Sequence, residues 1–238
     1  MWKLWVGSFF FSFLAVVAGC ATGPSPQDPY ENMNRVVFTV NDTLDTYIAK
    51  PVAKGYRSTA PEFVERGVGN FFGNLGEVTN VINDVLQGKW IQASYDGSRF
   101  LLNTLAGLGG LVDVANVAGL EKSQGEDFAQ TLRYWGLPAG PYIVLPILGP
   151  STATDIISIP ADWATTPLTY LEAETWRYRL TALEYTDKRK NLLDAEALMS
   201  GDKYIFIREA YLQSREFSAQ DGAVEDDFGG DLDDLEGF

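Results

Sequence analysis

Cys20 is the residue whose chemistry stands out, because it is the only cysteine among the 238 residues of this chain. It follows a positive charge at Lys3, a run of apolar residues over positions 4–18, and the short stretch Val17-Ala18-Gly19. A charged start, an apolar region and small residues before a cleavage point are typical of a secretory signal. The apolar region, about 15 residues long, is shorter than the ~20 residues that a membrane-spanning helix needs. We therefore predict that residues 1–19 are a signal peptide.

The stretch that ends in Cys20 resembles the processing site of a bacterial lipoprotein, with Val-Ala-Gly before the cysteine. The resemblance implies that Cys20 receives a diacylglycerol thioether, becomes the N-terminus after cleavage, and is then acylated on its amine. A buried structural cysteine and an ordinary secretory cleavage site are the alternatives. Two lipid signals already hold a protein stably on a membrane, so three chains would anchor this one permanently. Ala21 stands where an inner-membrane lipoprotein usually has aspartate, which implies an outer-membrane destination.

Motifs for enzyme catalysis are missing from the sequence. Because the chain has no histidine, it can build neither a Ser-His-Asp triad nor a zinc site of cysteines and histidines. It contains neither the G-x-S-x-G motif of hydrolases nor a phosphate-binding loop. Pairs such as Asp113 and Glu126 carry little information among 32 acidic residues, and Asp42 and Asp45 are better explained as surface groups than as metal ligands. We predict a protein that is not an enzyme and needs neither a metal nor a soluble cofactor.

Charge is distributed unevenly along the chain, whose net charge is −14. Residues 218–238 contain eight acidic side chains and no lysine or arginine, which predicts a disordered, solvated tail. Residues 20–29 include three prolines and are interpreted as a tether between the lipid and the folded body. The folded domain is then expected over residues 30–217. An acidic protein without a basic, aromatic-rich stripe is not expected to bind nucleic acid.

Apolar residues recur at helical spacing through most of this domain. We predict a helical run that Pro51 interrupts, a next helix with Pro61 in its first turn, and a helix that Gly88 closes. Further helices are predicted over residues 90–105, 173–193 and 203–217, and a short strand over 142–145. We interpret the apolar stripes of these helices as ordinary core packing. The predicted fold class is therefore mainly α.

Two segments rich in glycine or proline do not fit a compact helical bundle. Residues 105–120 are strongly apolar, with Asp113 and Asn116 as their polar side chains, and we expect a mobile element that contacts lipid or a partner. Residues 136–151 surround an apolar centre with four prolines and three glycines. At membrane depth, irregular backbone of this kind survives only against protein or a water-filled cavity. These segments favour a protein that is partly inserted at a membrane interface.

Several longer stretches carry a family resemblance: DPYENMNRVVFTVNDTLD (28–45), NFFGNLGE (70–77), RFLLNTLAGLGGLVDVA (99–115) and EDFAQTLRYWGLPAGPYIVLPILGPSTATD (126–155). In this order, behind a lipoprotein signal, they resemble the MlaA (VacJ) family of outer-membrane phospholipid-transport lipoproteins. The likeness continues through DKYIFIREAYLQSREF (202–217) and so covers nearly all of the chain except the acidic tail. One departure is Ala129, where the family often has glycine, and a helix accepts alanine readily.

The resemblance implies a ring of amphipathic helices that lies in the inner leaflet of the outer membrane around a central amphipathic pore. Phospholipids misplaced in the outer leaflet would pass through this pore to a periplasmic lipid carrier (MlaC in the family), which maintains lipid asymmetry. A trimeric outer-membrane porin is the membrane partner that the resemblance implies. The alternative is a lipid-anchored scaffold lipoprotein of the cell envelope without a lipid path. Such a scaffold would be expected to have a soluble body, and the irregular apolar segments argue against it.

Four residues are candidates for the lipid path. Asn103 and Asp113 would form the polar, pore-facing side of segment 105–120, unless they only cap or hydrogen-bond within the helices. In the stretch WRYRL (176–180), Arg177 or Arg179 would guide the lipid phosphate at the pore mouth. Arginine matches phosphate with a planar fork of donors, and tryptophan and tyrosine favour the membrane interface. The alternative is a solvated helix whose arginines pair with nearby glutamates.

Overall fold

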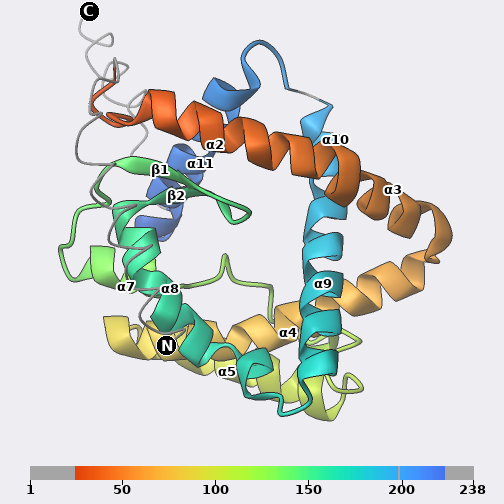
Figure 1. Cartoon of the computed structure of the whole chain (residues 1–238). Helices are drawn as coiled ribbons and strands as arrows, with labels where there is room; N and C mark the ends of the chain where they lie inside the picture. The colour runs from red at the N-terminus through yellow and green to blue at the C-terminus, as the bar shows by residue number, and fades with distance from the viewer. Residues whose placement is uncertain (1–24, 198, 223–238) are drawn as a thin grey trace, which may run out of the picture.

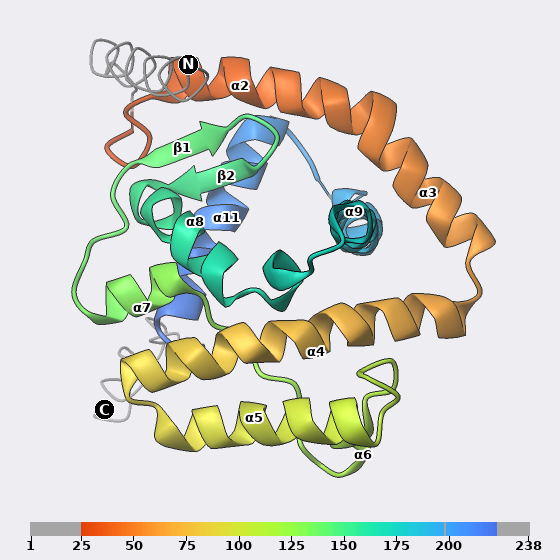
Figure 2. The same cartoon turned by 60° about the horizontal axis from the view of Figure 1, so that its bottom comes forward.

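The computed structural model describes residues 25–197 and 199–222, and within these ranges the chain is mainly helical. Helices α2 (Glu31–Leu44) and α3 (Lys50–Thr59) form one side of the molecule, and α4 (Glu62–Gln87) and α5 (Trp90–Leu105) form the opposite side (Figure 1). Helix α9 (Glu174–Asn191) runs between these sides. Helices α7 (Phe128–Tyr134), α8 (Ala153–Thr165) and α11 (Lys203–Ala219) lie at the other end. The ring of helices that the family resemblance implies is confirmed in two views (Figures 1 and 2).

Helices α2 and α3 are joined by one turn of π-helix, Asp45–Ala49. The expectation that Pro51 interrupts the helical run is therefore wrong, because the proline lies in the first turn of α3 and the chain stays helical to Thr59. A proline lacks an N–H, and its ring crowds the carbonyl group four residues earlier. The wider π-helical turn directly before Pro51 accommodates this ring without ending the helix.

Helix α4 is a single element of 26 residues that packs beside α5 (Figure 2). Pro61 precedes its first turn as the N-cap residue instead of lying within that turn. Gly88 closes the helix as predicted, with a φ of 77° that side chains other than glycine rarely adopt. The tight turn at Gly88 brings α5 back along α4.

A β-hairpin and α11 enclose a small apolar core. Strand β1 (Tyr142–Leu145) is the strand that the sequence predicts, and it pairs antiparallel with β2 (Gly149–Thr152). Tyr142 and Val144 are buried against Tyr204 of α11, and Phe38 of α2 packs edge-on to Tyr204. Among the described residues this cluster is the main group of buried apolar side chains, which is small for a domain of this length.

The remaining short elements are α6 (Val114–Val117), the 3-10 turn Pro167–Tyr170, and α10 (Leu193–Glu196). Helix α11 ends at Ala219 and therefore extends into the segment expected to be the acidic tail, of which residues 223–238 lie outside the described residues. None of the described helices combines the length and apolarity needed to cross a membrane.

The interpretation of the apolar stripes as core packing is wrong for several helices. Val40, Leu44 and Ile48 of the first helical run are exposed, and so are Val85 and Leu86 of α4. The opposite faces of the same helices carry polar residues, and these faces are the buried ones. An amphipathic pattern establishes that a helix has two faces, but the direction in which each face points depends on what surrounds the molecule.

Candidate functional site

The apolar exterior is the first feature with functional meaning. We use this name for the exposed large apolar side chains of α2 to α5 and of segment 105–120: Val36, Val40, Leu44, Ile48, Val52, Phe63, Ile82, Val85, Leu86, Trp90, Ile91, Leu101, Leu102, Leu105, Leu108, Leu111, Val112 and Val117. Ile91, Leu105 and Val117 are more than four-fifths exposed, at 89%, 82% and 85%. Apolar surface on this scale marks contact with a membrane or with another protein.

Polar side chains are buried where α4 packs against α5 and α7. Five polar residues of α4 (Asn74, Glu77, Asn83, Asp84, Gln87) and three of α5 (Asp96, Arg99, Asn103) are buried. We call this set the polar seam. Its α5 members recur at spacings of three and four residues, so they lie on one face of the helix. Burial of a polar group without a hydrogen-bond partner costs free energy, so the polar seam requires an extensive hydrogen-bond network.

Arg99 organises one end of the polar seam. Its Nε donates to Glu77 Oε1 at 3.0 Å, its Nη2 lies 3.2 Å from Asp113 Oδ2, and its Nη1 donates to the carbonyl oxygen of Leu120. Asn103 donates to Asp113 at 2.9 Å and accepts from the backbone N–H of Ala115 at 2.8 Å. These contacts fasten the glycine-rich segment 105–120 to the α4–α5 pair.

The structure therefore brings the predicted residues Asn103 and Asp113 together. Asp113 also accepts from the backbone N–H of Asn116 and caps α6. Burial opposes its ionisation, but the hydrogen bonds from Asn103 and Asn116 and the charge of Arg99 hold the pKa of Asp113 below its ordinary value. Both residues form hydrogen bonds that stabilise the local structure, as the alternative interpretation expects. Their pore-facing role stays a prediction. The mobility expected for this segment also stays a prediction.

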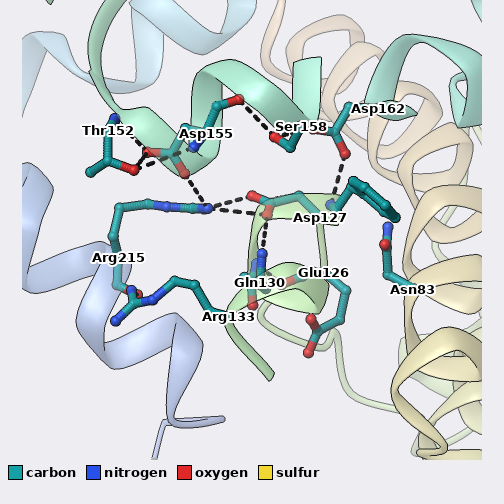
Figure 3. Close-up of polar contacts among 12 residues, drawn as sticks. Asn83, Glu126, Asp127, Gln130, Arg133, Thr152, Asp155, Ser158, Asp162 and Arg215 are labelled. Atoms are coloured by element: carbon teal, nitrogen blue, oxygen red, sulfur yellow. Dashed lines mark hydrogen bonds and ion pairs between the residues drawn. The ribbon is translucent and has the colours of Figure 1, made fainter. Parts of the chain in front are cut away.

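A second charged cluster joins three helices through Arg215 of α11 (Figure 3). Its guanidinium contacts Asp127 Oδ2 at 2.5 Å and Asp155 Oδ1 at 2.7 Å. Asp127 is the N-cap of α7, and Asp155 forms a capping box with Thr152 at the start of α8. Burial opposes ionisation of Asp127, yet the hydrogen bonds and charge of Arg215 hold its pKa below the ordinary value. One cation thus fixes the starts of two helices against a third.

Helix α9 carries the predicted headgroup residues on an exposed surface. Trp176, Tyr178 and Arg179 are exposed, and Arg177 is partly buried. The guanidinium of Arg179 lies over the ring of Trp176 at 5.2 Å, and that of Arg177 lies 5.5 Å from the ring of Tyr178. Arg177 approaches Glu174 at 3.8 Å, the limit of an ion pair. The structure therefore places each of the two arginines beside an aromatic ring of the same helix (Figure 1 shows α9).

The sequence analysis missed the central residues of both charged clusters. Arg99 and Glu77 are separated by 22 positions, and Arg215 and Asp127 by 88. Arg99 and Asn103 do share a helical face, which is a usable signal of polar residues on the packed side. Cys20 and the signal peptide lie outside the described residues. In the described ranges no group of three or more acidic, cysteine or histidine side chains has the arrangement of a metal site.

These features define a ring of amphipathic helices in which many of the side chains buried between helices are polar and many exposed side chains are apolar. The chain belongs to the MlaA lipoprotein family, whose model matches residues 26–218. It is 37% identical over 220 residues to the intermembrane phospholipid transport system lipoprotein MlaA of Escherichia coli (strain K12), an alignment that covers 88% of this chain and 86% of the relative. The relative of the same name from Haemophilus influenzae is 32% identical, with 87% of this chain and 88% of the relative covered.

A solved structure supports the same assignment. It is described as the structural basis for maintenance of bacterial outer membrane lipid asymmetry. The two chains share 37% sequence identity and superpose with a TM-score of 0.72, over 81% of this chain and 98% of the other. The likeness therefore extends to the fold of almost the whole solved chain.

Proposed function

We propose that this protein removes misplaced phospholipids from the outer leaflet of the bacterial outer membrane and passes them inward, which maintains lipid asymmetry. The observation that supports this most is that burial is reversed relative to a water-soluble domain. Val40, Leu44 and Leu105 are exposed, whereas Glu77 and Arg99 are buried. Such an exterior is suited to hydrocarbon, and such an interior tolerates charged groups. The names of the relatives, which describe intermembrane phospholipid transport, agree with this proposal.

The proposed mechanism is a wet path for the headgroup. A phospholipid that crosses a bilayer unaided must move its charged phosphate through hydrocarbon, at a cost of many kcal/mol. A central amphipathic pore within the ring of helices would solvate the headgroup and leave the acyl chains in apolar surroundings. No covalent bond changes in this process, so we propose that the protein is not an enzyme and needs no cofactor beyond its covalent lipid.

The position in the cell follows from the anchor. In this proposal Cys20 carries diacylglycerol and an N-acyl chain in the outer membrane, with the folded body facing the periplasm. A trimeric porin would hold the ring in the membrane, and a periplasmic carrier similar to MlaC would accept the lipid. The competing proposal is a lipid-anchored scaffold without a lipid path, which does not account for the buried charges within an apolar exterior.

Deletion of the gene in its own bacterium tests the proposal. Outer-leaflet phosphatidylethanolamine is measured in intact cells with an amine-reactive reagent that cannot cross membranes. The transport proposal expects labelling to rise in the deletion strain and to return to the original level when the gene is restored. An increase in envelope leakage without a rise in labelled lipid would favour the scaffold instead.

The arginines of α9 give a sharper test. We expect a double change, Arg177→Gln and Arg179→Gln, to leave protein levels normal, because an exposed ion pair contributes only about 0–1 kcal/mol. If the pair guides the lipid phosphate, cells should become sensitive to detergent with chelator, and outer-leaflet phospholipid should increase. The matched control is Arg66→Gln, an exposed arginine of α4 paired with Glu62 in the same helix. An intact barrier in the double variant would contradict the headgroup role.

A further inference from the structure

Asp84 is a buried carboxyl group without an apparent hydrogen-bond donor. It lies in the last turns of α4, within the polar seam, and is 0% exposed. Both of its carboxylate oxygens lack a hydrogen-bond partner among the described residues. An ionised carboxylate in this position would bear the full cost of burial, which exceeds that of a neutral polar group by a wide margin. The unpaired oxygens therefore require a chemical explanation.

Asp96 of α5 is the neighbouring group that explains the unpaired oxygens of Asp84. Its two oxygens already accept hydrogen bonds, Oδ1 from Gln92 at 2.9 Å and Oδ2 from Ser123 at 3.1 Å. Asp96 is therefore arranged as an ionised acceptor, and Asp84 lies within hydrogen-bonding reach of it. Two carboxylates this close cannot both ionise easily, so one of them retains a proton.

We propose that Asp84 carries a proton and donates it to Asp96, so that a carboxyl–carboxylate pair links α4, α5 and the segment 121–126 in a pH-dependent manner. The pair satisfies the otherwise unpartnered Asp84 and leaves one negative charge where two would repel. Ser123 connects segment 121–126 to the same pair through Asp96. This is a device for sensing pH that neither the family assignment nor the proposed transport requires.

The charged groups around the pair all bear on its protonation. Glu77 of α4 lies near Asp96, and Glu126 adds negative charge from the segment before α7. Lys89 opposes them from the α4–α5 turn, but it is already paired with Glu126 and Asp221. Arg99, the other cation of the seam, is bound to Glu77 and Asp113. The balance favours a retained proton.

The pKa directions agree with this geometry. Burial is the largest cause that raises the pKa of Asp84, followed by the charges of Asp96 and Glu126, and the value reaches about 7. Burial also raises the pKa of Asp96, with the charge of Glu77 as the next cause. Asp96 lines a cavity of about 750 Å³ together with Lys89, Ser123 and Glu126, which gives the pair a route for proton exchange with water.

The sign of the effect follows from linkage. The folded protein holds the Asp84 proton more tightly than the unfolded chain does, so the stabilisation is complete below the ordinary carboxyl pKa. It is lost progressively as the pH rises through about 7, the pKa of the folded state. Above that range both carboxylates are charged, and repulsion weakens the contact between the α4–α5 corner and segment 121–126.

Asp84→Asn tests the proposal because an amide mimics the protonated acid and donates to Asp96 permanently. We expect the melting temperature of the full chain in detergent micelles to fall by several degrees from about pH 6 to about pH 8.5, and Asp84→Asn to remove most of that fall. At about pH 8.5 the variant should melt above the unchanged protein. Infrared spectra of the unchanged protein should show a carboxylic-acid band that disappears over the same range and is missing in the variant.

The matched control is Glu121→Gln, an exposed carboxyl group that lines the same cavity. This change should leave both the pH dependence of melting and the infrared band as they are. The infrared measurement on the unchanged protein keeps the test decisive even if the variant folds poorly. Absence of an acid band at about pH 6, or a band that persists in Asp84→Asn, would overturn the proposal.

Discussion

Replacing Cys20 with serine is expected to abolish lipid attachment completely and to release the protein from the membrane fraction. The thioether that begins lipoprotein maturation requires a thiol, and serine cannot form it. Each buried CH₂ of an acyl chain contributes about 0.8 kcal/mol to membrane binding, so loss of all three chains removes the anchor. Cells labelled with radioactive palmitate should show label in the original protein and none in Cys20→Ser. Label that persists in the variant would contradict the anchor assignment.

A second variant separates the thiol from its position. Cys20→Ser combined with Ala21→Cys keeps one thiol but shifts it by one residue relative to Val17-Ala18-Gly19. If the cleavage-site pattern directs lipidation, this variant should also remain unlabelled. The tether limits how far the anchor can lie from the folded body: the eight residue-to-residue steps from Cys20 to Asp28 span at most roughly 26–29 Å. Asp28 is fixed because it is fully buried and bound by Asn34 and Arg208.

Replacing Arg99 with methionine is expected to destabilise the fold by about 3–5 kcal/mol, the usual cost of removing one partner from a buried ion pair. Arg99 and Glu77 are each 2% exposed, and the change leaves Glu77 and Asp113 without their shared cation. A typical domain has only about 5–15 kcal/mol of stability, so this loss is a large fraction of it. Thermal unfolding of the full chain in detergent micelles, followed by circular dichroism, measures the effect.

Arg66→Met is the matched control for this prediction. Arg66 is 69% exposed and forms an ion pair with Glu62 in the same helix, so its loss should cost no more than about 1 kcal/mol. A double change, Arg99→Met with Glu77→Gln, should recover part of the lost stability because it removes one of the uncompensated charges. If Arg99→Met unfolds within the range of Arg66→Met, the polar seam does not stabilise the ring.

Both charged clusters explain how a ring with little apolar core holds together. Arg99 fastens segment 105–120 to α4 and α5, and Arg215 fastens α11 to the starts of α7 and α8. A further network connects Arg189 of α9 to Asp45 and Glu196, and it holds the pKa of Glu196 at about 2, since the bonds from Lys50 and Arg189 outweigh burial. In these contacts, charge pairs replace much of the apolar packing that a water-soluble domain would use.

The local sequence was sufficient to predict the structural elements that depend on neighbouring residues alone. Gly88 ends α4 because glycine accepts a positive φ, and the stretch Tyr142–Leu145 forms the predicted strand. The motifs from residue 28 to residue 217 were sufficient for the family, which the comparisons confirm. Pro51 was misread, because the π-helical turn that accommodates it depends on the geometry of the preceding residues and not on the proline alone.

The sequence by itself determined that the helices are amphipathic, and the tertiary structure decided which face is buried. The apolar stripe of Val40, Leu44 and Ile48 would be the same in a helix packed on a protein core and in a helix that contacts lipid. Helical periodicity shows that a helix has an apolar face but does not show what that face contacts. The partners of Arg99 and Arg215 were equally beyond the sequence, since 22 and 88 residues separate them from Glu77 and Asp127. The turn at Gly88 brings Arg99 of α5 onto Glu77 of α4, and the packing of α11 against α7 and α8 brings Arg215 onto Asp127 and Asp155.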